Sequence, residues 1–155
     1  MNAEHLLQTC NRPWVMKHHT ELSQDIMAKS ICLDGKEMTS FFGILTEFAD
    51  KFEFPNYFGF NFNALDEMLA DLEWFPRSSY IVVIRNGDYL FRDEREDLEW
   101  FLSFLGRISE EWSVPVAQGE NWDRPAIPFH TIVQTSLNLP LDDFPDENLL
   151  MIGRI

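Results

Sequence analysis

The sequence lacks the features that small proteins use as covalent staples or membrane anchors. Its two cysteines, Cys10 and Cys32, form no C-x-x-C motif and no cluster with histidine, so neither a disulfide framework nor a metal site is indicated. The longest apolar run, residues 80–84, is far too short to span a membrane. The N-terminus has no basic segment followed by an apolar run, the pattern of a secretory signal. We therefore expect a cytoplasmic protein with reduced thiols and no membrane association.

Basic residues are also scarce. Lysine and arginine number 12 against 26 aspartates and glutamates, which makes the formal net charge −14. Such a surface repels phosphate backbones, so direct binding to nucleic acid is not expected. It suits a basic protein partner, although acidity also serves solubility alone. The glycine-rich motifs that bind nucleotides and the G-x-S-x-G motif of hydrolases do not occur, and we expect no cofactor.

The chain is nevertheless rich in apolar residues, at 45%, and its 155 residues fit one main domain. Hydrophobic patterning predicts strands over residues 26–33, 79–84 and 127–133. Helices are expected after a cap at Thr39 or Ser40, from near Asn61, and after Asp93, where Asp93 and Glu96 resemble a capping box. The order strand, helix, helix, strand, helix, strand favours a small α/β fold with about three parallel strands.

We divide the chain into three parts. Residues 1–25 form an N-terminal extension with a possible short helix, and its segment 11–19 has no clear pattern. Residues 26–135 form the α/β domain. Residues 136–155 form an acidic C-terminal tail. His130, in the last predicted strand, is interpreted as a structural histidine.

The second predicted helix has two different faces. At 100° per residue, its apolar residues fall on one face: Phe62, Leu65, Met68, Leu69 and Leu72. Polar or small residues fall on the other: Asn63, Asp66, Glu67 and Ala70. Residues 56–75 contain four acids and no lysine or arginine, so the repulsion between Glu67 and Asp71, one turn apart, is not offset nearby in the sequence. This pattern fits an ordinary solvated face, and it also fits a surface that presents negative charge to a partner.

The run FPNYFGFNFNALDEMLADL, residues 54–72, resembles the signature of the barstar family, the intracellular inhibitors of secreted ribonucleases such as barnase. The matching positions are Pro55, Asn56, Tyr57, Phe58, Gly59, Asn61, Phe62, Ala64, Leu65 and Glu67. The resemblance covers about residues 26–134. It implies a barstar-like α/β fold and a non-enzymatic inhibitor, an immunity protein that protects its own cell from a ribonuclease toxin.

The resemblance also implies residue roles. In this family a loop and the following helix plug the ribonuclease active site, so Glu67 would take the place of an RNA phosphate. Tyr57 would be an aromatic contact, and Asn61 an amide that stiffens the loop or touches the partner. The full set of expected partner-binding residues is Tyr57, Phe58, Asn61, Asn63, Asp66, Glu67 and Asp71. We expect a monomer that binds one partner molecule.

Three positions depart from the family pattern, and they keep other functions open. Asn63 stands where the family has aspartate, Asp66 where it usually has tryptophan, and Glu67 where it has the shorter aspartate. One alternative is therefore the same fold binding a non-nuclease toxin or a regulatory protein. Another is an acidic hydrolase or metal-binding domain. A partly buried pair of carboxylates in a pocket would favour the hydrolase, whereas a convex acidic helix would favour the inhibitor.

Overall fold

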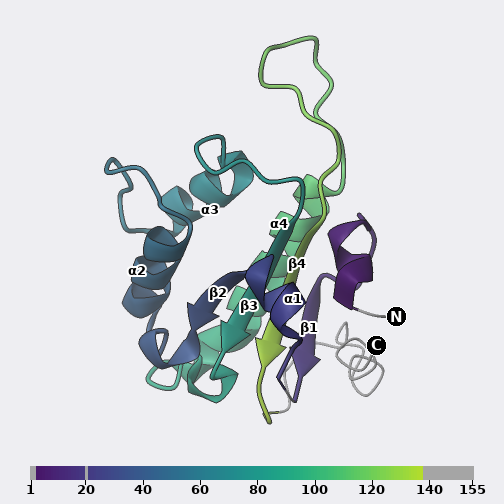
Figure 1. Ribbon diagram of the computed structural model, residues 1–155. Helices are drawn as coiled ribbons and strands as arrows, with labels where there is room; N and C mark the ends of the chain where they lie inside the picture. Colours follow the sequence, from purple (N-terminus) through teal and green to yellow (C-terminus); the bar gives the residue numbers. More distant parts are fainter. Residues whose placement is uncertain (1–2, 20, 138–155) are drawn as a thin grey trace.

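In the computed structural model, which describes residues 3–19 and 21–137, the chain is built on one parallel sheet (Figure 1). The strands are β1 (Val15–His18), β2 (Ile31–Asp34), β3 (Tyr80–Arg85) and β4 (Phe129–Gln134). They lie in the order β1-β4-β3-β2, and every neighbouring pair is parallel. The predicted α/β class is confirmed, and β2, β3 and β4 account for the three expected strands.

The fourth strand, β1, was not predicted. It comes from the segment 11–19, which has no clear pattern, and it pairs with β4 so that Val15 lies opposite Thr131. Part of the segment 1–25, expected to be an extension, therefore belongs to the sheet. Four residues are too few to reveal a strand by alternation, and this strand forms because it covers the edge of β4. Before it, η1 (Ala3–Leu7) is a short 3₁₀ helix, near where a short helix was expected.

The prediction of a single strand over residues 26–33 was wrong. That segment is divided between α1 (Gln24–Ala28) and β2. The hydroxyl of Ser23 accepts a hydrogen bond from the backbone N–H of Ile26 at 3.3 Å and caps the helix. Because so short a helix buries only Ile26, its apolar pattern is indistinguishable from that of a strand end.

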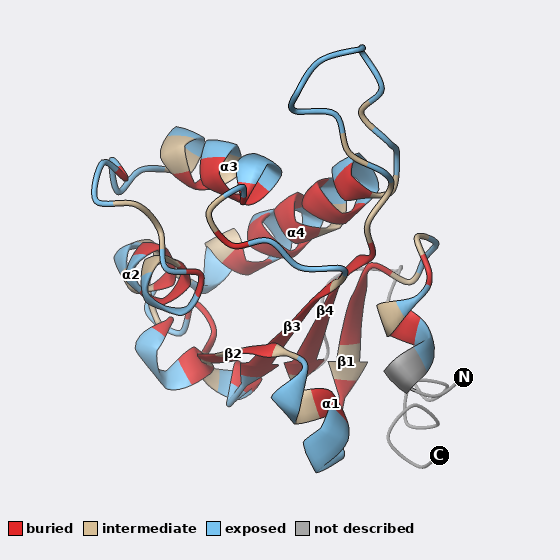
Figure 2. Cartoon of the chain, turned by 45° about the horizontal axis from the view of Figure 1, so that its top comes forward, coloured by how far each residue is buried: buried red, intermediate tan, exposed pale blue. Residues whose placement is uncertain are grey.

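The helices are divided between the two faces of the sheet (Figure 1). One face carries α2 (Phe41–Lys51), α3 (Phe62–Asp71) and α4 (Leu98–Trp112), and the other carries α1 and η1. In β3, Tyr80, Val82 and Ile84 join the larger core under α2, α3 and α4, whereas Ile81 and Val83 join the smaller core. Both faces of the strand are buried, as Figure 2 shows for most of the sheet and as is usual for parallel sheets.

The start of α4 also differs from the prediction. Asp93 and Glu96 do not form a capping box, because a 3₁₀ turn, η4 (Arg95–Asp97), precedes the helix. The carboxylate of Glu94 instead accepts a hydrogen bond at 2.6 Å from the backbone N–H of Phe41, at the start of α2. This acidic run therefore ties α2 to the start of α4, a tertiary contact that a local motif does not reveal.

His130 on β4 is a structural residue, as predicted. Its side chain is fully buried, and its two ring nitrogens lie 2.7 Å and 2.8 Å from the backbone carbonyl oxygens of Pro13 and Thr9. The histidine thus holds the segment before β1 against the sheet. Burial lowers the pKa of its ring, although both carbonyls oppose that shift.

Two further expectations concern the membrane and the tail. Among the described residues, no helix is long and apolar enough to cross a membrane. The expected acidic tail, residues 136–155, lies outside the described part of the chain from residue 138 onward.

Candidate functional site

The loop between α2 and α3, residues 53–61, is fixed by a buried aromatic residue. Phe58 is only 6% exposed, and its ring centroid lies 4.9 Å from that of Phe54 and 4.7 Å from that of Phe60. Its backbone N–H donates to the carbonyl of Pro55 at 3.0 Å and closes a tight turn. Phe58, expected among the partner contacts, therefore points into the core and supports the loop from below.

Asn61 joins this loop to α3. Its side-chain oxygen accepts from the backbone N–H of Ala64 at 2.9 Å, which makes it the N-cap of the helix. Its side-chain amide donates to the carbonyl of Gly59 at 3.3 Å, so one residue binds both segments. A Cβ atom on Gly59 would lie 3.2 Å from that amide, so a larger residue would press on this hydrogen bond. The stiffening role expected for Asn61 agrees with these contacts.

The inner face of α3 is apolar, as the helical periodicity predicted. Its buried residues are Leu65, Met68, Leu69 and, at the C-cap, Leu72, while Phe62 is half-buried. The indole N–H of Trp112 on α4 donates to the carbonyl of Leu69 at 2.8 Å. This buried hydrogen bond fixes the position of α3 relative to α4.

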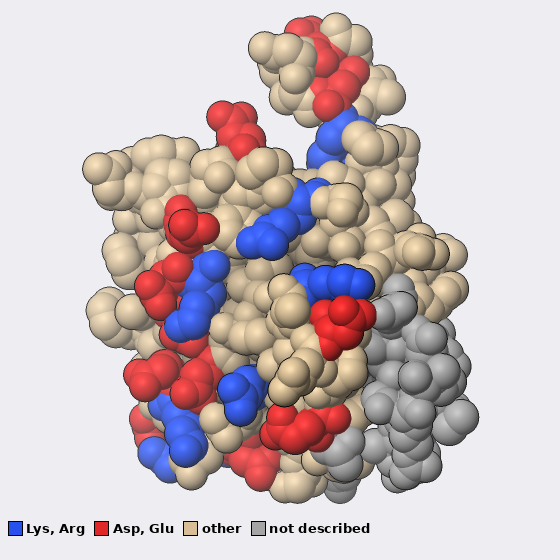
Figure 3. Space-filling model, viewed as in Figure 1, with Lys and Arg blue, Asp and Glu red and all other residues tan. Residues whose placement is uncertain are grey.

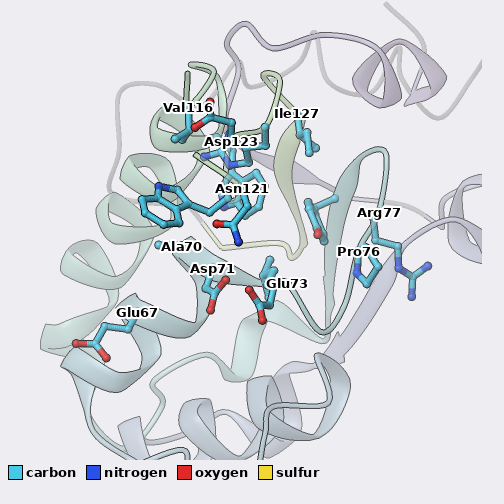
Figure 4. Close-up of a pocket in the computed structure, with 15 residues that line it drawn as sticks. Glu67, Ala70, Asp71, Glu73, Pro76, Arg77, Val116, Asn121, Asp123 and Ile127 are labelled. Atoms are coloured by element: carbon cyan, nitrogen blue, oxygen red, sulfur yellow. The ribbon is translucent and has the colours of Figure 1, made fainter. Parts of the chain in front are cut away.

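The outer face of α3 presents Asn63, Glu67 and Asp71 to solvent. Glu67 forms no ion pair with any residue that the structure describes. Its carboxylate points away from the neighbouring side chains in Figure 4. An exposed carboxylate without an ion pair is accessible to a cation from outside the chain.

Asp66 has a different environment from that of Glu67. Its carboxylate lies 3.2 Å from the guanidinium of Arg107 on α4, and Arg107 also contacts Glu111 at 2.7 Å. Asp66 therefore has a basic partner in the folded protein, although residues 56–75 contain none. Tertiary packing brings this cation to Asp66 from α4, far along the chain from α3.

Two exposed aromatic side chains beside α3 were not predicted as site residues. Phe42 is 69% exposed and Phe60 is 49% exposed, and their rings stack at 6.3 Å. Phe60 has a positive φ of 51°, which is uncommon for a bulky residue. Periodicity contained a signal for Phe42, since it falls off the apolar face of its helix. With the exposed Tyr57, these rings extend the solvent-facing surface of the loop.

The arrangement suits binding better than acid-base chemistry. Glu67 and Asp71 lie on the outer face of α3, where both are exposed to solvent and border an open groove rather than a buried site. No group of three or more histidines, cysteines, aspartates or glutamates in the described part of the chain is placed to hold a metal ion. What the α3 surface offers is preorganised negative charge beside exposed rings.

A comparison with protein families also finds a match for this chain. The family model described as Barstar (barnase inhibitor) matches residues 28–134. The chain belongs to the barstar family. The matched segment runs from α1 to the end of β4, so it includes the capped loop and all of α3 but not β1. The barstar family consists of inhibitors rather than enzymes, and its partners are barnase-like ribonucleases. No curated protein matches the chain.

Proposed function

We propose that this barstar-family protein inhibits a ribonuclease by placing the loop 53–61 and the outer face of α3 in its active site. The observation that carries the proposal is Glu67, an exposed carboxylate without an ion pair among the described residues, centred on a helix that is fixed at both ends. Ribonuclease active sites bind phosphate with cationic side chains, and a carboxylate held in that position competes for them.

The physical basis of such inhibition is electrostatic preorganisation. The N-cap Asn61 and the buried Phe58 hold the surface in shape before a partner arrives, so little conformational entropy is lost on binding. Opposite charges accelerate the encounter and specify its orientation. One inhibitor molecule would cover one active site, with no cofactor. In the cell, the protein would act as a cytoplasmic immunity protein against a ribonuclease toxin.

The other expected contact residues take unequal parts in this proposal. Tyr57 presents an exposed ring beside the charge, and Asp71 adds a second negative charge one turn after Glu67. Asn63 offers hydrogen bonds without charge. Asp66 contributes less than Glu67, because Arg107 already neutralises part of its field.

Titration of ribonuclease activity tests the proposal. Barnase and basic ribonuclease toxins would be assayed with a fluorogenic RNA substrate against increasing amounts of the full chain. We expect stoichiometric inhibition of at least one enzyme. The substitution Glu67→Gln should raise the dissociation constant of the complex with that enzyme at least about 30-fold, which is the effect of losing one interface hot spot. Glu99→Gln, at an exposed acid on α4, is the matched control and should change it less than about twofold. Equal losses in both variants would contradict the assignment to α3.

A second candidate function is the same surface binding a protein that is not a ribonuclease. It is favoured by Asn63, which lacks the charge that the family pattern has, and by the ion pair that occupies Asp66. Binding that depends on Glu67, without inhibition of RNA cleavage by the bound partner, would support this alternative over the first.

A further inference from the structure

The segment between α4 and β4, residues 114–126, projects well beyond the body of the molecule (Figures 1 and 2). We call it the projecting loop. Val116 and Arg124 exchange two backbone hydrogen bonds of 2.9 Å, as in a short antiparallel ladder. Near the tip, the carboxylate of Asp123 accepts from the backbone N–H groups of Gln118 and Gly119 at 2.9 and 2.8 Å, which lowers its pKa and keeps it ionised. The loop is thus held in shape by its own hydrogen bonds.

The base of the projecting loop is anchored to α4. The guanidinium of Arg124 lies 4.0 Å from the centroid of the Trp112 ring. It also donates to the backbone carbonyls of Val114, Pro125 and Glu111 at 3.2, 3.3 and 3.4 Å. In Figure 3, acidic side chains lie at the tip of the loop and basic ones lie at its base. Arg124 therefore fixes the direction in which the loop projects.

An aromatic residue is displayed near the tip of this loop. Trp122 is 60% exposed, and its indole N–H donates to the side-chain oxygen of Gln118 at 3.2 Å. The ring is therefore held in the solvent by its own loop rather than buried against the body. Tryptophan is one of the residue types most enriched among the energetic anchors of protein interfaces.

Between the projecting loop and the C-terminal end of α3 lies a groove of about 660 Å³. Trp122 and Asp123 line it from the loop, and Asp71 and Glu73 line it from the end of α3 and the segment after it, as Figure 4 shows for the three acids. Glu67 lines the same groove at its far end. The groove therefore adjoins the surface described above, with Trp122 and Asp123 on one side and Asp71 and Glu73 on the other.

Two cations also border the groove. Arg124 is stacked on Trp112, which lines the groove too, so its charge lies within the lining. Arg77 lies over the ring of Phe75, 4.4 Å from its centroid, and points away from the groove in Figure 4. Four acids, Glu67, Asp71, Glu73 and Asp123, stand against these two arginines, so the lining of the groove is negatively charged on balance.

We propose that this groove is a second contact surface that takes an arginine side chain of the partner protein. A guanidinium is planar, so it can stack on Trp122 while its N–H groups donate to the carboxylates of Asp71 and Glu73. A lysine would stack less well and make fewer directed hydrogen bonds. The proposal rests on the proposed function for the identity of the partner, and it adds the projecting loop as a second arm around it.

The groove can be tested on the full chain without the partner. The probe is the peptide acetyl-Gly-Arg-Gly-amide, and its citrulline analogue, which has nearly the same shape and no charge, is the control ligand. The readout is the ¹⁵N–¹H resonance of the Trp122 indole, assigned by its loss in Trp122→Phe. We expect a saturable shift with the arginine peptide at millimolar concentration, and at least a fivefold weaker shift response with citrulline.

Variants test whether the arginine peptide binds beside Asp71 and Glu73. The double variant Asp71→Asn/Glu73→Gln should raise the dissociation constant of the arginine peptide at least fivefold. Glu120→Gln, an exposed acid of the same loop that does not line the groove, should leave it within about twofold. The inference is overturned if the indole resonance does not move, if citrulline binds equally well, or if Glu120→Gln weakens binding as much as the double variant.

The ribonuclease assay separates this inference from the function on which it rests. If the arginine peptide gives a saturable shift but the protein inhibits no ribonuclease, the result supports arginine binding in the groove and counts against a ribonuclease as the partner. Inhibition that depends on Glu67, combined with no shift of the Trp122 indole, would support the inhibitor and overturn the groove.

Discussion

The α3 surface and the projecting loop both present acids and aromatic rings, but they are built in different ways. The α3 surface is specified locally, by a cap at Asn61 and a buried ring at Phe58, over a helix whose inner face belongs to the main core. The projecting loop has almost no core of its own and depends on Arg124 and Asp123 for its shape. An exposed surface can thus be held in shape by packing against the core, or mainly by polar and cation–π contacts.

The largest effect is expected where the α3 surface rests on the core. Phe58→Ala removes a ring that is 6% exposed and should lower the free energy of unfolding by about 3–5 kcal/mol. Tyr57→Ala, next to it but 69% exposed, should lower it by less than about 0.5 kcal/mol. Urea denaturation of both variants measures the difference. Similar values for the two would mean that the loop is not supported by Phe58.

A smaller global effect is expected where the projecting loop is anchored. Arg124→Gln removes the contact with Trp112 and the guanidinium hydrogen bonds, and should lower the free energy of unfolding by about 1–2 kcal/mol. Proteolytic cleavage within residues 114–126 should accelerate by more than this loss predicts, because the loop can open without unfolding the core. Arg77→Gln, which also removes a guanidinium from an aromatic ring, should leave cleavage of the loop unchanged.

The smallest effect of the three concerns the helix cap. Asn61→Ala removes the side chain that caps α3 and should lower the free energy of unfolding by about 1 kcal/mol. Asn63→Ala, at an exposed position inside the same helix, should change it by no more than about 0.5 kcal/mol. Thermal or urea denaturation checks both. A loss in Asn63→Ala as large as that in Asn61→Ala would remove the cap as the local determinant of this surface.

Most of the α3 surface could be predicted from the sequence, because its determinants lie within a few residues of one another. The helix start near Asn61 and the two faces of the helix both follow from local patterns. Local patterns also predicted β2, β3 and β4 and their parallel pairing. The predicted position of β2 was too early in the chain, because residues 26–33 include part of α1. The burial of Phe58 was not foreseen, since a run of alternating aromatics does not say which ring turns inward.

The sequence by itself determined the helices α2 and α3, three of the four strands, the overall acidity and the family resemblance. Only the tertiary structure decided that β1 joins the sheet, that Arg107 neutralises part of Asp66, and that Trp122 faces a groove ended by Glu67. The physical reason is the distance along the chain over which each kind of interaction acts. Capping and periodicity act over a few residues, whereas the pairing of a charge or a strand edge depends on which distant segment the fold brings to it.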